Sequence, residues 1–165
     1  MTTSNWPDLS GMYPALGRIT AHWPFVEIAM DNTISVIWQK VPGGNKIAKE
    51  VPISLTNKLQ FLKKAFGRLP ELAQFKTRAL QLIKQITDNK EQRHDRIHGG
   101  VVGAMLDSAL STSVYHFIRI EYQKTSHHTV TGTISPAGLD KQGEMVEQLR
   151  RDWTAFSHDV IRAFP

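Results

Sequence analysis

The sequence contains no cysteine among its 165 residues, which excludes disulfide bonds and thiolate metal sites. No apolar run is long enough to span a lipid bilayer, and the first residues lack the basic and apolar segments of a secretory signal. Glycine-rich phosphate loops, nucleophile elbows, catalytic-triad spacings and internal repeats are also missing. These absences predict a soluble, cytoplasmic protein that does not enter a membrane and uses no cofactor.

The composition is typical of one globular domain, which we predict over residues 1–165 with residues 1–14 as a flexible arm. Hydrophobic residues make up 41% of the chain, which is enough for a core. The net charge of +5 allows attraction to phosphate polymers or acidic partners. Many basic residues fall on two predicted helices, where solvated faces are the simplest explanation. They are Lys58, Lys63, Lys64 and Arg68 on one helix, and Lys76, Arg78, Lys84, Arg93 and Arg96 on the next.

Apolar residues at helical spacing predict four principal helices. They cover residues 15–38, 55–69, 72–97 and the region after Asp140. Ser54 and Asp140 are suitable N-caps for the second and the last of these helices. Pro24 predicts either a kink in the first helix or a new helix start there, with Trp23 before it.

Alternating β-branched and aromatic residues predict two strands, over 113–123 and 129–134, that pair as a hairpin. His127 and His128 are expected in the exposed turn between them. Residues 101–110 are apolar and fit either a helix or buried coil. The predicted fold class is therefore mainly α, a four-to-five-helix up-and-down bundle with a β-hairpin inserted at 113–134, before the last long helix.

The third helix changes character toward its end. Continuing its apolar period reaches Lys90, Arg93 and Ile97, so a face that should meet the core becomes polar. Because a buried polar group without a partner is costly, such a face usually borders a cleft, an interface or a partner. Arg93 and His98 are five residues apart and are expected to flank one shallow pocket before a glycine pair ends the helix. The apolar stripe that precedes them comprises Leu72, Phe75, Ala79, Leu82, Ile83 and Ile86.

The segment Arg93-His94-Asp95-Arg96-Ile97-His98 resembles the signature of the HEPN (higher eukaryotes and prokaryotes nucleotide-binding) superfamily. That signature is an arginine, four further residues and a histidine at the end of a long bundle helix. The residue after the arginine is usually polar in the family, as His94 is, and a glycine often follows the histidine, as in this chain. The resemblance implies a HEPN-like domain over the whole chain. It also implies either a metal-independent endoribonuclease of toxin or defence type, or a relative that binds RNA or nucleotide.

The resemblance makes Arg93 and His98 the candidate catalytic residues. Histidine titrates near neutral pH, so His98 can take the proton of a ribose 2′-hydroxyl or protonate the leaving oxygen. Arg93 can hold the scissile phosphate and offset the charge that builds up on it. His94, Asp95 and Arg96 are supporting candidates, and the product would be a 2′,3′-cyclic phosphate.

Two carboxylates on the first helix are further supporting candidates. Glu27 and Asp31 are one helical turn apart and could accept hydrogen bonds from an inward arginine, although two exposed carboxylates are the simpler explanation. The resemblance also implies a homodimer in which the motifs of two protomers face each other, with RNA and a cognate antitoxin as further partners. Independently, Trp23, Trp38 and Trp153 exceed what a small bundle must bury, which predicts two-fold packing.

A structural explanation of the same motif stays open. Arg93 could form an ion pair with Glu27, Asp31 or Asp95, and His98 could interact with the carbonyl groups at the helix end. The protein would then be a non-catalytic, dimeric helical interaction or scaffold protein.

A metal site is a third explanation. His94 and His98 are one helical turn apart, a spacing that lets two imidazoles bind zinc, with His127, His128 or Glu27 as a third ligand. The metalloprotease motif has glutamate where this chain has an aspartate, and the neighbouring arginine adds repulsive charge. We therefore assign no metal site.

Overall fold

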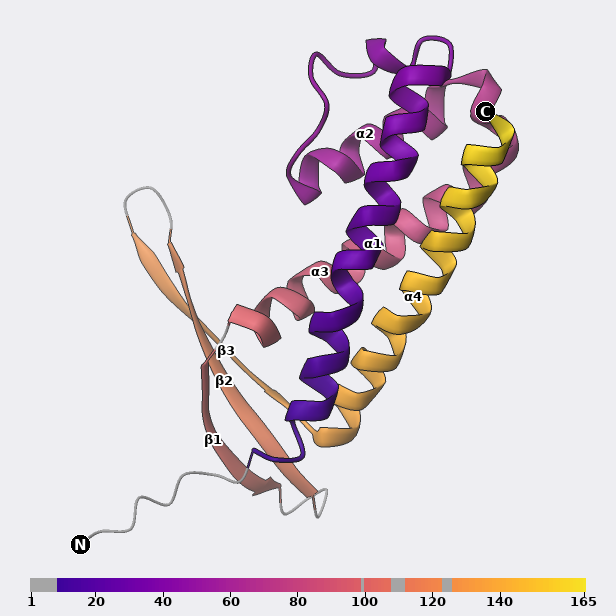
Figure 1. Cartoon of the computed structure of the whole chain (residues 1–165). Helices are drawn as coiled ribbons and strands as arrows, with labels where there is room; N and C mark the ends of the chain where they lie inside the picture. The colour runs from indigo at the N-terminus through magenta and orange to yellow at the C-terminus, as the bar shows by residue number, and fades with distance from the viewer. Residues whose placement is uncertain (1–8, 99, 108–111, 123–125) are drawn as a thin grey trace, which may run out of the picture. The chain divides into compact units, whose positions relative to one another are not determined.

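The computed structural model describes residues 9–98, 100–107, 112–122 and 126–165, and the side chains of these residues except those in 91–100, 103–113 and 122. Two short 3-10 helices, Gly44–Lys46 and Pro70–Phe75, precede α2 and α3. The principal elements are α1 (Tyr13–Lys40), α2 (Leu55–Arg68), α3 (Lys76–His98), β1 (Gly100–Asp107), β2 (Thr112–Tyr122), β3 (His127–Ile134) and α4 (Pro136–Ala163) (Figure 1). The mainly helical class, with a small antiparallel sheet before the last helix, is confirmed.

The chain divides into two compact units. The sheet unit comprises residues 1–20 and 90–146, and the helical unit comprises residues 21–89 and 147–165. Three helices, α1, α3 and α4, contribute residues to both units. The up-and-down arrangement of the helices and the single domain over 1–165 stay predictions. Among the described residues, no helix combines the length and the apolarity that crossing a bilayer requires.

The core of the helical unit is built by the apolar faces that the sequence predicts. The ring of Phe156 on α4 has its centroid 5.5 Å from those of Phe66 and Trp153, and 6.1 Å from that of Phe75. Trp23 and Trp153 are buried in this chain, and Trp38 is half-buried against Phe61. Because the protomer itself covers the first two indoles, these two tryptophans give no support to a dimer, which stays a prediction.

α1 runs without a break through Pro24. Proline in a helix interior removes one backbone hydrogen bond, so a new helix start was a reasonable expectation, but it is wrong. Packing outweighs the local cost, because Trp23 and Val26 on either side of the proline are buried. The indole Nε1 of Trp23 also donates a hydrogen bond to Glu27 Oε1 at 2.6 Å, one turn further along the helix. The helix begins at Tyr13 after the buried Met12, two residues earlier than predicted.

Of the two predicted N-cap residues, the one of α2 is confirmed and the one of α4 is wrong. Ser54 caps α2 as predicted, since its side chain accepts a hydrogen bond from the Asn57 backbone N–H. α4 begins at Pro136, and the hydroxyl of Ser135 accepts a hydrogen bond from the Gly138 N–H at 3.1 Å, so the prediction of Asp140 as its cap is wrong. Proline fits the first helical turn, where its missing N–H has no partner to lose.

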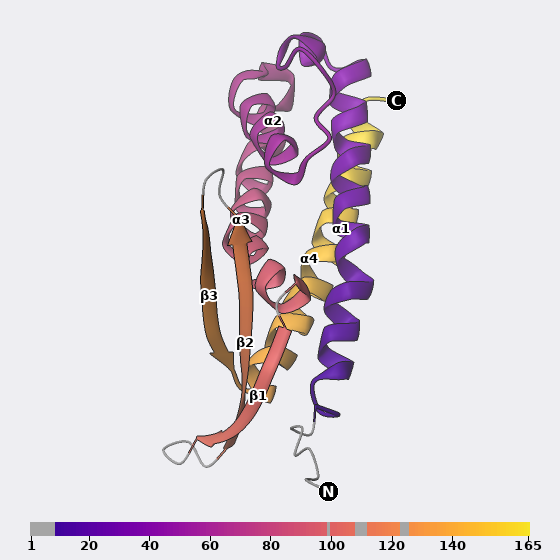
Figure 2. The ribbon, with the colours of Figure 1, turned by 90° about the vertical axis from the view of Figure 1, so that its left-hand side faces the viewer.

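The sheet has three antiparallel strands in the order β1-β2-β3 (Figure 2). β2 and β3 form the predicted hairpin, with Phe117 opposite Gly132. The expectation of a helix or coil over 101–110 is wrong for the described part, because β1 pairs with the other edge of β2. An extra residue between Val101 and Gly103 shifts the register of that pairing, which hides the strand pattern in the sequence. His127 and His128 belong to β3 and not to the turn, although both are exposed.

Candidate functional site

The Arg93–His98 motif lies in the last turns of α3, which ends at His98, and β1 begins at Gly100. In a regular helix, residues five apart are separated by about 7.5 Å along the axis and about 140° around it. The side chains of the motif, including those of His94, Asp95 and Arg96, lie outside the described residues. The convergence of Arg93 and His98 on one pocket therefore stays a prediction.

The apolar face of α3 becomes polar just before the motif, as the sequence predicts. Ile86 is buried, and the next inward residue is Asn89, whose Nδ2 donates a hydrogen bond to the Gln85 carbonyl at 2.7 Å. The predicted inward residue, Lys90, is only half-buried, so the inward position lies one residue earlier than predicted. Because the amide is satisfied within the helix, the polar face begins without an unpaired buried group.

Glu27 and Asp31 contact a lysine of α2 in the described structure. Lys58 Nζ lies 2.8 Å from Asp31 Oδ1 and 3.9 Å from Glu27 Oε2. Lys58 is 8% exposed, so its placement on a solvated face is wrong: its stem packs inside the unit while its ammonium group reaches the carboxylates. This cluster joins α1 to α2.

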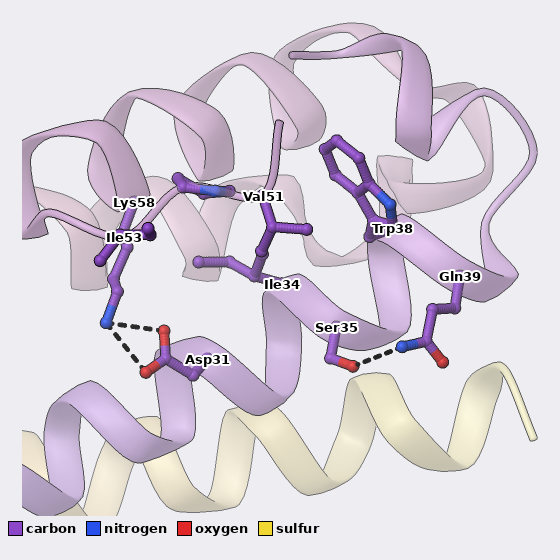
Figure 3. A pocket seen from close by; sticks show the side chains of 9 residues that line it. Asp31, Ile34, Ser35, Trp38, Gln39, Val51, Ile53 and Lys58 are labelled. Carbon is purple, nitrogen blue, oxygen red and sulfur yellow. Dashed lines mark hydrogen bonds and ion pairs between the residues drawn. The ribbon is translucent and has the colours of Figure 1, made fainter. Parts of the chain in front are cut away.

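A cavity of about 330 Å³ adjoins this ion pair, and we call it the Lys58 cavity. Figure 3 shows the ammonium group of Lys58 directed at both oxygens of Asp31, with Ile34 and Trp38 along the α1 wall. The segment before α2 adds Val51 and Ile53, both exposed apolar side chains. The cavity offers apolar walls, and its lysine is already paired.

Basic side chains of α3 are engaged in ion pairs. Arg78 Nη1 lies 2.7 Å from Asp159 Oδ2 on α4, and its Cζ lies 5.5 Å from the centroid of the Phe156 ring. Lys84 pairs with Asp88 one turn further along α3, at 2.5 Å. Hydrogen bonds from Arg162 and Arg78 lower the pKa of Asp159 below its ordinary value of 3.8. These contacts assign Arg78 to the joining of α3 and α4.

The histidines at the start of β3 also have structural contacts. His128 Nε2 lies 2.8 Å from Glu121 Oε2, and Arg119 contacts the same carboxylate from β2. Within the ranges whose side chains are described, no group of three or more histidine and carboxylate side chains could hold a metal ion. The side chains of His94 and His98 lie outside those ranges, so the zinc alternative is not tested by the structure.

A second cavity of the helical unit was missed from the sequence. It has a volume of about 190 Å³ between α1 and α4, and we call it the Arg150 cavity. Four of its lining residues, Arg150, Thr154, Ser157 and His158, follow one another at helical spacing along one face of α4. This polar stripe beside the apolar one is the signal that could have found it.

Comparison with protein-family models, with curated proteins and with solved structures finds no match for this chain.

Proposed function

We propose that this chain is a HEPN-like protein that binds RNA and cleaves it without a metal ion. The observation that carries the proposal is the position of Arg93 and His98 in the last turns of a long helix. The signature needs this setting, and the sequence alone could not guarantee it. The buried Asn89 also supports it, because a polar residue follows the buried Ile86 on the inward face of α3 shortly before the motif.

In the proposed reaction, the ribose 2′-oxygen attacks the adjacent phosphorus and the bond to the 5′-oxygen breaks. His98 takes the 2′-hydroxyl proton or protonates the leaving 5′-oxygen, since an imidazole can do either near neutral pH. Arg93 donates hydrogen bonds to the non-bridging oxygens, where negative charge grows. His94, Asp95 and Arg96 orient these groups, and the products are a 2′,3′-cyclic phosphate and a 5′-hydroxyl.

A symmetric homodimer is part of this proposal, because the resemblance implies motifs that face each other across a two-fold axis. A cognate antitoxin is the partner expected for a toxin of this kind. Light scattering at high protein concentration tests the dimer, and a monomer mass would contradict it.

The test of the activity is RNA cleavage in EDTA by the wild-type protein and by His98→Ala. We expect cleavage that leaves a cyclic phosphate, with a loss of about 10²-fold or more in the variant. His127→Ala is the matched control, an exposed histidine on β3 that should leave cleavage unchanged. Absence of cleavage by the wild type, or equal cleavage by His98→Ala, would contradict the proposal. Activity that EDTA abolishes would support the zinc alternative.

A non-catalytic interaction or scaffold protein is the second candidate. The exposed side chains of Val51 and Ile53 at the Lys58 cavity favour it, because large apolar groups on a surface often mark a contact site. This candidate predicts that Ile53→Ser weakens self-association or partner binding, while RNA remains uncleaved by every form of the protein.

A further inference from the structure

The Arg150 cavity combines polar groups, most of them from α4, with apolar side chains from α1. Phe25 and Ile28 form the apolar side, and about half of each side chain is exposed. Arg150, Ser157 and His158 supply polar atoms on the opposite side. The described residues that line the cavity all belong to the helical unit.

Ser157 is the first sign that this cavity has an occupant. The residue is 2% exposed, and its Oγ has no hydrogen-bond partner within the described part of the chain. Two other hydroxyls of the helical unit, those of Thr33 and Thr87, donate to the carbonyl one turn earlier at 2.8 Å. Ser157 makes no such bond, although it lines the cavity, so its hydroxyl is available to a ligand.

Arg150 is the second sign. Its Nε is buried without a hydrogen-bond partner, and no ion pair involves its guanidinium group among the described residues. The next residue, Arg151, differs, because it donates to Glu147 Oε1 at 2.5 Å and to Gln148 Oε1 at 2.7 Å. A buried donor that remains unpaired costs stability, and a ligand that accepts from it would recover that cost.

The charges around the cavity favour an anion. Arg150 is the charged residue that lines it, and no carboxylate does so in the part of the chain that is described. The acidic residues nearby on α4 are engaged elsewhere: Glu147 with Arg151, Asp152 with Gln148, and Asp159 with Arg78 and Arg162. The local field is therefore positive, as an oxyanion requires.

We propose that the Arg150 cavity binds a small phosphate monoester whose organic part is flat or apolar. A guanidinium group, two hydroxyls of Thr154 and Ser157, and the amide of Asn32 offer more donors than the two oxygens of a carboxylate need. The three terminal oxygens of a phosphate can use them, and arginine is suited to such oxygens. In the proposed complex the organic part lies against Phe25, an aromatic side chain that lines the cavity.

Calorimetric titration with phenyl phosphate, inorganic phosphate and benzoate tests this proposal. Phenyl phosphate should bind saturably, and about tenfold more tightly than either of the other two, since each lacks one part of the ligand. Arg150→Gln should weaken binding of phenyl phosphate by about tenfold or more, since a charge-assisted donor is lost. Arg151→Gln is the matched control on the same helix and should bind like the wild type.

Ser157→Ala is the second variant and guards against misfolding of Arg150→Gln. It should weaken binding several-fold without lowering the melting temperature, because the hydroxyl has no partner to lose among the described residues. Three results would overturn the proposal: no saturable binding of phenyl phosphate, equal weakening by Arg150→Gln and Arg151→Gln, or equally tight binding of benzoate. The motif at the end of α3 is untouched by these variants, so RNA cleavage tests a separate claim.

Discussion

The Lys58 cavity and the Arg150 cavity, both in the helical unit, differ in what their basic side chains contact. Lys58, beside the larger cavity, has its ammonium group 2.8 Å from Asp31 and 3.9 Å from Glu27. Arg150, beside the smaller one, has a buried Nε without a partner in the described part of the chain. By volume, the Lys58 cavity would be the better candidate for a binding site. The Arg150 cavity is the better candidate when buried polar atoms without a partner among the described residues are considered.

Polar groups that stabilise the fold can be separated from polar groups that are available to a ligand by whether they have a partner. A paired group stabilises the folded chain and loses that contribution when it is removed. An unpaired buried group costs stability until something binds it. Removing a paired group should therefore lower the free energy of unfolding, whereas removing an unpaired buried group should raise it.

The largest effect on stability is expected at Lys58. Lys58→Ala removes a buried stem and leaves Asp31 and Glu27 without their cation, so the free energy of unfolding should fall by about 2 kcal/mol. Urea denaturation measures this change. Lys63→Ala, at an exposed position of the same helix, should change it by less than about 0.5 kcal/mol. Equal effects of the two substitutions would mean that the ion pairs of Lys58 do not stabilise the fold, which would contradict the contrast between the Lys58 and Arg150 cavities.

At Gln142 in the sheet unit, a substitution is expected to raise the free energy of unfolding. Its side chain is 4% exposed, and neither Nε2 nor Oε1 has a partner among the described residues. Gln142→Met keeps the volume and removes both unpaired atoms, so the free energy of unfolding should rise by about 1 kcal/mol. Gln81→Met at an exposed position of α3 is the control and should have little effect. A loss of stability in Gln142→Met would show that these atoms are paired in solution.

The smallest effect is expected at the exposed ion pairs of Asp159, beside the Arg150 cavity. Its pKa is lowered by hydrogen bonds from Arg162 and Arg78, so its stabilising contribution is present above about pH 3.8 and is lost as the pH falls through the lowered pKa. The difference in urea midpoint between the wild type and Asp159→Asn should shrink as the pH is lowered from 7 to about 2. A difference that stays constant over this range would mean that the carboxylate is not held by the two arginines.

Periodicity predicted the elements whose packing is amphipathic and regular. The stripe of α4 from Val146 to Val160 and that of α3 up to Ile86 are buried as expected, because each repeats at the period of the helix. β1 was not predicted, because a register shift beside Gly103 interrupts the alternation of residues that is typical of a strand. The alternative of a new helix start at Pro24 is wrong for a different reason. The buried Trp23 and Val26 on either side keep the helix continuous despite the local preference of proline.

Site residues were harder to predict, because their state depends on partners that are distant in sequence. Nothing near Lys58 in the chain reveals that Asp31, 27 residues earlier, binds its ammonium group. Likewise, an arginine and a serine on α4 look ordinary until α1 is seen to form the other wall. The Arg93–His98 motif could be recognised because its parts lie within one helix, whereas the arrangement of its side chains stays a prediction.

Unfolding and RNA cleavage should be measured together on Arg93→Ala, because the two measurements separate a catalytic role of Arg93 from a structural one. A catalytic Arg93 predicts a loss of cleavage on the order of 10²-fold with an unchanged melting temperature, because charge stabilisation of the reacting phosphate is removed. A structural ion pair predicts a loss of roughly 3–5 kcal/mol of stability if the pair is buried. That loss, or a variant unchanged in both stability and cleavage, would contradict the assignment of the functional site to the end of α3.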